Sequence, residues 1–258
     1  MTGTDETYIH ETHDKMIEVK GLFSVMNENV ILSDVNFHVR SREITVIIGA
    51  SGSGKTTVLK YLLGLYPSIG DVVSVLGQNP SELDETEEKE FYRQIGVLYQ
   101  EGALLNSMTV GENLALPLEQ HTRLSGEFIE EIVRLKLQMV NLEEAFEKFP
   151  SQLSGGMLKR AALARAIVMD PPLLFIDEPG SGLDPVTLSQ LDSLILNLKE
   201  LLGMTVVMVT HEVSSILRMA DRIVFLEKGS SIFQGTLESA LESKLTALKE
   251  FFSKGRGE

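Results

Sequence analysis

A glycine-rich segment, Gly49-Ala-Ser-Gly-Ser-Gly-Lys-Thr56, has the residue types and spacing that bind a polyphosphate. It matches the pattern G-x-x-x-x-G-K-[ST], and it lies between a short apolar run at Ile44–Ile48 and an expected helix at Thr57–Gly64. Glycines let backbone N–H groups turn inward around phosphate oxygens, and a helix N-terminus adds positive potential there. A plain glycine-rich turn would explain the glycines but not Lys55, which can reach the terminal phosphates. The segment therefore predicts a nucleotide site lined by Gly49, Ser51, Gly52, Ser53, Gly54, Lys55, Thr56 and Thr57.

Two acids, Asp177 and Glu178, end the apolar run that begins at Leu173. The carboxyl end of a parallel strand is where ligands bind in α/β sheets. Asp177 can hold Mg²⁺ through water, and Glu178 can act as a general base toward an attacking water. The acids could instead cap the next helix, but the phosphate-binding segment favours the catalytic interpretation.

A second glycine-rich helix start is expected at Leu153-Ser-Gly-Gly-Met157, before an alanine-rich helical stretch, Leu158–Met169. Such a start is an anion site, and one nucleotide rarely needs two of them in one fold. The economical explanation is a dimer in which Ser154, Gly155 and Gly156 complete the pocket of the partner chain. The alternative is that Ser154 only caps the helix, which leaves the adjacent glycines unexplained. Lys159, Arg160 and Arg165 are expected to stabilise this helix and not to take part in catalysis.

Strands and helices must alternate to position these residues. Val35, Phe37 and Val39 alternate with polar residues, as in a half-exposed antiparallel strand, whereas Ile44–Ile48 reads as a buried one. Further strands are predicted at 72–76, 95–99, 173–177, 205–209 and 222–225, with helices over most of 109–166, where Phe128, Ile132 and Leu135 have helical spacing, and over 185–202 and 237–252. The alternation predicts an α/β fold with a parallel sheet, and the middle third reads as an inserted helical lobe.

Composition narrows the class of protein. The chain has 258 residues, a formal net charge of −14 and no cysteine, which disfavours a nucleic-acid partner and excludes a disulfide framework. The polar N-terminus, 1–15, is not expected to be a signal peptide. The longest apolar runs, 44–48 and 204–209, are far shorter than the roughly 18 residues of a membrane span, so a soluble chain is expected. The acidic stretch Glu82–Glu90 reads as a solvated helix face, with a docking site as the alternative.

Taken together, the motifs resemble those of ATP-binding-cassette (ABC) ATPases in order and spacing, from about Met16 to Gly235. Gly49–Thr56 is similar to Walker A, Leu153–Met157 to the signature and Leu173–Glu178 to Walker B, while Gln100 matches the Q-loop glutamine and His211 the switch histidine. The D-loop is matched by Ser181–Asp184.

The resemblance implies one ABC ATPase domain over 1–258. A RecA-like P-loop core (16–100 and 167–235) would carry an antiparallel β subdomain, a helical subdomain with the signature (101–166) and a helical tail (236–258). It implies ATP and Mg²⁺ as cofactors, with Thr56, Gln100 and Asp177 at the metal, and Glu178, His211 and Gln100 in catalysis. Asp184 would signal across a homodimer.

Two positions depart from the wider family. The signature ends in Met157 where most members have glutamine. Many members stack an aromatic residue on adenine at a position that corresponds here to Met26 or Val25, neither of which is aromatic. Phe23 lies nearby but is expected to pack within its strand.

The stretch from Tyr99 to Leu118, together with Gln120–Leu124 and Met157, resembles the ATPases of MCE/Mla-type lipid transport systems. That resemblance implies an integral membrane permease, an MCE-type lipid-binding protein as an indirect partner, and a place on the cytoplasmic face of a bacterial inner membrane or an equivalent plastid membrane. The alternatives are another ABC transporter, for lipoprotein release or small-solute import, or a non-transport ABC ATPase.

Two apolar groups remain outside the catalytic motifs. Leu104, Leu105 and Met108 are expected to be exposed and to accept a short helix from a permease, with packing inside the helical lobe as the alternative. Leu241, Leu245, Leu248 and Phe252 fall on one face of a predicted tail helix, which could cap the core or reach the partner subunit.

Overall fold

The computed structural model describes residues 15–68 and 72–254, which divide into two compact units. The first unit joins Met1–Glu88 to Ala220–Glu258, and the second is Lys89–Met219. The N-terminal stretch 1–15, which is not expected to be a signal peptide, lies outside the described residues apart from Lys15. Within the described residues, every helix is too short or too polar to cross a bilayer.

The first unit is built on a sheet whose strands have the order β4-β1-β2-β9-β8-β3. They are β1 (Lys15–Met26), β2 (Asn29–Arg40), β3 (Ile44–Gly49), β4 (Val73–Val75), β8 (Arg222–Glu227) and β9 (Ser230–Thr236). β2 pairs antiparallel with β1, and its buried Val35, Phe37 and Val39 confirm the alternating pattern. β3 is buried along its whole length and runs parallel to β8, as a continuous apolar run predicts.

The second unit contains three described strands that run parallel, in the order β7-β6-β5. They are β5 (Ile95–Leu98), β6 (Leu173–Asp177) and β7 (Thr205–Val209). The apolar side chains of β6 are fully buried, so this strand is covered on both faces. Residues 99–172 connect β5 to β6, and most of this connection is helical. The observed α/β class, with parallel strands, an antiparallel part and an inserted helical segment, confirms the predicted fold class.

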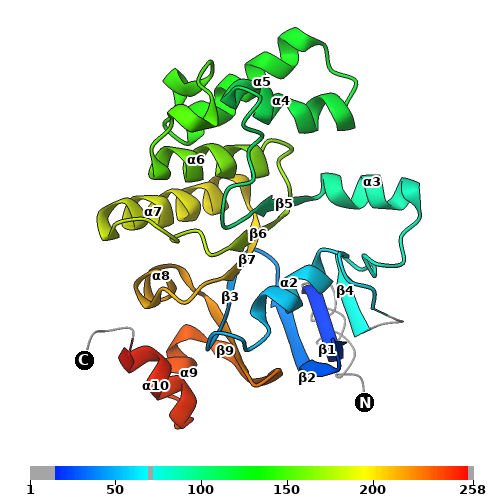
Figure 1. Ribbon diagram of the computed structural model, residues 1–258, viewed down its shortest axis with the longest axis vertical. Coiled ribbons are helices and arrows are strands. Elements are labelled where there is room, and N and C mark those ends of the chain that lie inside the picture. The colour runs from blue at the N-terminus through cyan, green and yellow to red at the C-terminus, as the bar shows by residue number, and fades with distance from the viewer. Residues whose placement is uncertain (1–14, 69–71, 255–258) are drawn as a thin grey trace, which may run out of the picture. The chain divides into compact units, whose positions relative to one another are not determined.

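Most helices of the described chain overlap the expected segments, but the helix at Val213–Met219 was not predicted (Figure 1). The described helices are α2 (Lys55–Leu62), α3 (Glu85–Arg93), α4 (Val110–His121), α5 (Gly126–Met139), α6 (Gly155–Ala166), α7 (Pro185–Leu202), α8 (Val213–Met219), α9 (Leu237–Leu241) and α10 (Thr246–Lys254), with 3₁₀ turns at Glu143–Ala145 and Pro150–Gln152. All residues of α3 except the buried Phe91 and the half-buried Tyr92 are exposed, as expected for a solvated acidic helix.

The buried face of α5 differs from the expected one. Phe128 and Leu135, which have helical spacing with Ile132, are exposed, whereas Ile129 and Val133 are buried. Apolar residues lie on both sides of this helix, so spacing alone did not identify the face that packs against α4 and α6.

The prediction of a single helix over 237–252 is wrong. The tail is interrupted after α9 and resumes at α10, and of the four apolar residues only Leu248 and Phe252 are buried. The ring of Phe251 lies 5.8 Å from that of Phe225 on β8, so α10 packs against its own unit. This part of the tail therefore covers the core of the first unit.

We expect Leu248→Ala to lower the free energy of unfolding by about 2–5 kcal/mol, because it removes a fully buried side chain and leaves a cavity. Leu245→Ala is the matched control, since that leucine is 39% exposed, and it should change stability by less than about 0.5 kcal/mol. Urea-induced unfolding of the two variants measures the difference. Equal stabilities would show that α10 does not contribute to the core.

Candidate functional site

The glycine-rich loop leaves β3 at Gly49 and enters α2 at Lys55. Lys55 folds back over the loop, where its Nζ donates to the carbonyl oxygens of Gly49 (2.9 Å) and Ala50 (3.1 Å). Ser53 is buried, and its hydroxyl oxygen has no hydrogen-bond partner among the described residues. The loop thus places an ammonium group and an unsatisfied hydroxyl at the start of a helix.

Two glycines of this loop are required, Gly49 by close packing against backbone and Gly54 by its backbone conformation. A Cβ at Gly49 would lie 2.2 Å from the carbonyl oxygen of Leu226, and one at Gly54 would lie 2.4 Å from Cδ2 of Leu32. Gly54 also has a φ of 100°, a conformation that side-chain-bearing residues rarely adopt. The loop is therefore held against β8 and β2 in a shape that only glycine permits.

The start of α2 suits a phosphate. The first N–H groups of a helix have no partner within the helix, and no side chain caps this one. Ser51, Gly52 and Thr56 are exposed, and Thr57 is half-buried in the first turn. Backbone N–H groups, the helix dipole, Lys55 and the Ser53 hydroxyl together match the needs of phosphate oxygens, so the residues present fit the predicted ligand.

In the second unit, the carboxyl ends of β6 and β7 bring an acid and a histidine together. Glu178 follows β6, and its N–H donates to the carbonyl of Val209 on β7 at 2.8 Å. His211 Nδ1 lies 2.9 Å from Glu178 Oε1, and the His211 N–H donates to the same carboxylate at 3.4 Å. Glu178 also has a φ of 45°. The carboxylate is therefore fixed by two neighbouring strand ends, with the imidazole beside it.

The capping alternative for Asp177 and Glu178 is not supported. The next helix, α7, is capped by Asp184, whose carboxylate accepts from the N–H groups of Val186 and Thr187 at 3.0 Å. Asp177 stands at the end of β6, half-buried. Neither acid is therefore the cap of α7.

Gln100 belongs to the same unit and lies near the D-loop segment. Its side-chain N–H donates to Ser181 Oγ at 3.3 Å, and the Ser181 N–H donates to the Glu178 carbonyl at 3.2 Å. The structure thus connects Gln100, Ser181 and Glu178, which lie far apart in the sequence. The contact between Gln100 and Ser181 was not predicted, because no spacing rule relates a loop after β5 to a loop after β6.

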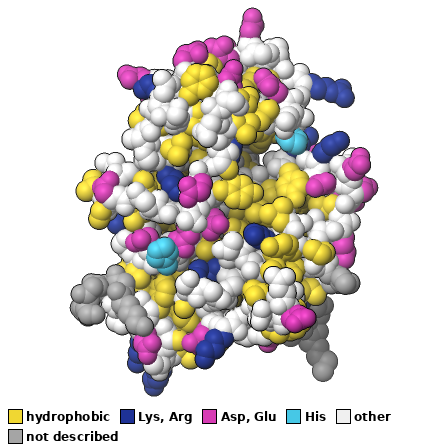
Figure 2. Space-filling model, viewed as in Figure 1, with side chains coloured by type: hydrophobic (Ala, Val, Ile, Leu, Met, Phe, Trp, Pro, Cys, Tyr) yellow, Lys and Arg dark blue, Asp and Glu magenta, His cyan; other side chains and the backbone are white. Residues whose placement is uncertain are grey.

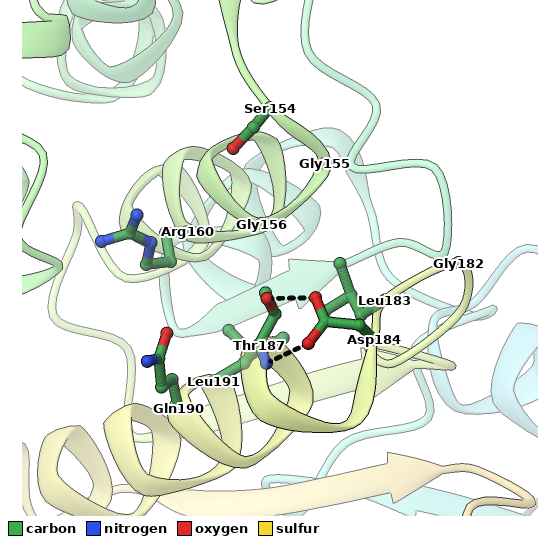
Figure 3. A pocket seen from close by; sticks show the side chains of 10 residues that line it. All are labelled: Ser154, Gly155, Gly156, Arg160, Gly182, Leu183, Asp184, Thr187, Gln190 and Leu191. Carbon is green, nitrogen blue, oxygen red and sulfur yellow. Dashed lines mark hydrogen bonds between the residues drawn. The ribbon is translucent and has the colours of Figure 1, made fainter.

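The glycine-rich start of α6 lines a cavity of about 290 Å³ together with the start of α7 (Figure 3). The Thr187 hydroxyl donates to the Asp184 carboxylate at 2.5 Å, and this bond lowers the pKa of Asp184. The lining residues are Ser154, Gly155, Gly156, Arg160, Gly182, Leu183, Asp184, Thr187, Gln190 and Leu191.

Ser154 caps α6, accepting from the Met157 N–H at 3.3 Å, as the capping alternative predicts. Gly156 has a packing role, since a Cβ there would lie 2.6 Å from Thr187 Cγ2. Gly155 has no such constraint, because its Cβ would meet only Leu183 at an ordinary 3.8 Å. The cap and helix packing therefore account for Ser154 and Gly156 but leave Gly155 and the open cavity unexplained.

The three cations of α6, which were expected to stabilise this helix, bind backbone carbonyls of neighbouring segments. Lys159 donates to the carbonyl of Gln100, Arg165 to those of Gly102 and Ala103, and Arg160 to those of Val140 and Asn141. They bind the backbone of segments that pack beside α6. These contacts join residues that are far apart in the sequence, so the spacing of residues along one helix cannot predict them.

The predicted packing of Phe23 is also wrong. Its side chain is 56% exposed on β1, whereas its neighbours Leu22 and Ser24 are buried. The strand alternates, and Phe23 falls on the outer face with Val25.

Acidic side chains are spread over the face drawn in Figure 2, and Lys and Arg lie singly or in small groups among them. This distribution is consistent with the net charge of −14.

Parallel strands that end in a glycine-rich phosphate loop and in paired acids are typical of P-loop nucleotide hydrolases. A sequence model of the family described as "ABC transporter" matches residues 32–181. The chain belongs to this ABC transporter family, and it is an ATP-binding, ATP-hydrolysing member.

Three relatives illustrate the similarity. The chain is 39% identical, over 93% of its length and 90% of the relative, to the intermembrane phospholipid transport system ATP-binding protein MlaF of Haemophilus influenzae. It is 38% identical, over 92% of its length and 68% of the relative, to the probable ribonucleotide transport ATP-binding protein mkl of Mycobacterium leprae. The dimeric post-hydrolysis structure of the ATP-binding cassette MJ0796, bound to ADP and Pi, superimposes with a TM-score of 0.76 at 34% identity, covering 86% of this chain and 99% of that one.

We expect Glu178→Gln to reduce steady-state ATP hydrolysis by about 10²–10⁴-fold, the usual effect of removing a general base, while ATP binding stays close to that of the unmodified chain. Lys55→Ala should instead weaken binding, because it removes the ammonium group from the phosphate loop. Phosphate release and equilibrium nucleotide titration separate the two effects. Normal turnover by Glu178→Gln would exclude Glu178 as the base.

Proposed function

We propose that this chain is the ATPase subunit of a transporter that moves phospholipid or a related lipid between membranes. The observation that carries the proposal is the similarity to MlaF, which is named for that function and matches over 93% of this chain and 90% of its own length. Met157 in the signature agrees with the resemblance to MCE/Mla-type systems. The mkl relative, named for ribonucleotide transport, is the reason to test a nucleotide-like cargo as well.

In the proposed reaction, water adds to the terminal phosphorus of ATP, the β–γ bridge breaks, and ADP and inorganic phosphate leave. Glu178 accepts the proton of the attacking water, and His211, 2.9 Å from its carboxylate, is the proposed contact of the terminal phosphate. The glycine loop and Lys55 bind the phosphates.

Mg²⁺ is part of the proposal, with Thr56, Gln100 and Asp177 as its ligands. A hydroxyl, an amide and a carboxylate are oxygen donors of the kind Mg²⁺ prefers. When bound, the ion neutralises charge on the phosphate oxygens.

The proposal includes a head-to-tail homodimer. The start of α6 carries an unexplained glycine and an open cavity beside Asp184, and a nucleotide held on the α2 start of another copy would supply the missing anion. The dimeric cassette MJ0796 supports this arrangement by similarity. Asp184, at the edge of the same cavity, is then placed to sense the partner.

Mixing Lys55→Ala and Ser154→Arg subunits tests the shared site. Each variant alone should be inactive, but a mixed dimer has one site with both motifs intact and should keep about half of the normal turnover. In an equimolar mixture about half of the dimers are mixed, so about a quarter of the normal turnover should return. ATPase activity across mixing ratios is the measurement. Ser154→Ala is the control for the helix cap and should cost about 1 kcal/mol of stability. Nucleotide-trapped dimers that form normally from Ser154→Arg alone would rule out the shared site.

The permease partner would dock beside the segment that follows Gln100. Asn113 is fully buried and holds this segment, donating to the carbonyls of Leu105 (3.0 Å), Met108 (3.2 Å) and Thr109 (2.9 Å) and accepting from the Leu105 N–H (2.7 Å).

A loop held in this way presents fixed side chains. Leu105 is 44% exposed, as expected, whereas Leu104 and Met108 are half-buried and so only partly accessible to a partner. The chain would then lie on the cytoplasmic face of the membrane through its permease, with an MCE-type protein as an indirect partner.

We expect Leu105→Glu to fold and bind ATP but to lose co-purification with the permease and lipid movement, because a charge replaces an exposed apolar anchor. Leu201→Glu is the matched control, since that leucine is 71% exposed on α7, and it should keep the permease. Retained permease binding by Leu105→Glu would place the docking surface elsewhere. Transport of ribonucleotide and not of lipid by the intact complex would overturn the lipid assignment.

A further inference from the structure

Cations on α6 bind three backbone carbonyls of the Gln100–Ala103 segment. Lys159 Nζ donates to the carbonyl of Gln100. Arg165 donates through Nη2 to the carbonyl of Gly102 at 3.1 Å and through Nη1 to that of Ala103 at 2.7 Å. The segment is thus attached to the helix that begins with the signature, at two points nearly two turns apart.

The segment adopts a backbone shape that makes these bonds possible. Gly102 and Ala103 both have positive φ values, 76° and 52°. A Cβ at Gly102 would lie 3.2 Å from the Ala162 Cβ, between the two cations on the same helix. Close packing and hydrogen bonds therefore fix the same few residues.

Lys159 is an unusual residue for a purely structural contact. Its side chain is buried, and burial lowers the pKa of its ammonium, while Glu101, Asp177 and Glu178 act in the opposite direction. A buried cation is costly unless its hydrogen bonds are made, and here its bond is to the main chain of the predicted metal ligand.

We propose that Lys159 and Arg165 are positioning residues that fix Gln100 relative to the start of α6, so that the Q-loop segment and the signature turn move as one piece. The inference rests on the proposed roles of Gln100 and of Ser154–Gly156. It adds the physical connection between them: cation-to-carbonyl bonds that any displacement of α6 transmits to Gln100.

Lys159→Met tests the attachment, with Lys159→Arg as the conservative variant. Lys136→Met is the matched control, because Lys136 is also buried in this unit and pairs with Asp170 and not with the Q-loop segment. Hydrogen exchange is measured at the amides of residues 100–104, without nucleotide or metal.

We expect Lys159→Met to speed exchange of that segment by about tenfold or more, since opening then no longer breaks a charged hydrogen bond. Lys159→Arg should stay near the unmodified rate, and Lys136→Met should leave the segment unchanged. Unchanged exchange in Lys159→Met, or an equal change in Lys136→Met, overturns the inference. If Lys159→Met does not fold, hydrogen exchange of residues 100–104 is measured in Arg165→Gln instead, with the same expected and contradicting results.

A second measurement separates this inference from the proposed function. Lys159→Met should raise the Mg²⁺ concentration for half-maximal ATP hydrolysis by about tenfold, the usual effect of disturbing a group that orients a metal ligand. Gln100→Ala is measured beside it. If Gln100→Ala leaves the Mg²⁺ requirement unchanged, the proposed role of Gln100 fails, and the exchange result alone decides whether the attachment exists. If Gln100→Ala raises the requirement and Lys159→Met does not, the positioning role is overturned.

Discussion

Unpartnered N–H groups at the start of a helix are the constraint on which the two functional motifs depend. The two glycine-rich helix N-termini differ in how their N–H groups are satisfied. At α2 no side chain caps the helix, and Gly49 and Gly54 let the loop lie against β8 and β2. At α6 the hydroxyl of Ser154 takes one N–H, and Gly155 leaves the helix start open toward a cavity. An anion satisfies both starts, and a nucleotide between two copies would satisfy them together.

Charged side chains that bind main-chain carbonyls recur around the predicted site. Lys55 donates to two carbonyls of its own loop, so hydrogen bonds hold the loop conformation without bound phosphate. Lys159 and Arg165 do the same for the segment after β5. Such bonds set the backbone in advance, and preorganisation reduces the entropy lost when a ligand binds. The carboxylate of Glu178 is held differently: it accepts from the backbone N–H of His211 and contacts the imidazole of the same residue.

The sequence predicted the helices and strands that are marked by residues within or beside them. Pro185–Leu202 was predicted with the bounds of α7. Its Asp-Pro start and the glycine that follows it are local signals for the two ends of a helix. The strand β9 was missed, since its polar residues give no apolar alternation; the Lys228-Gly229 turn, with positive φ at both positions, was its available signal. The break in the tail and the buried face of α5 depend on tertiary packing, which spacing does not contain. Likewise, the motifs predicted roles for Glu178 and His211, but their contact follows from the pairing of β6 with β7, which the motifs do not contain.

The central claim is that one nucleotide is held by helix starts from two chains. The most direct measurement is the native mass of the Glu178→Gln chain, in which bound ATP should persist, with and without MgATP. The account predicts dimers that carry two nucleotides with MgATP and monomers without it. A monomer saturated with nucleotide, or a dimer that carries no nucleotide, would contradict this claim.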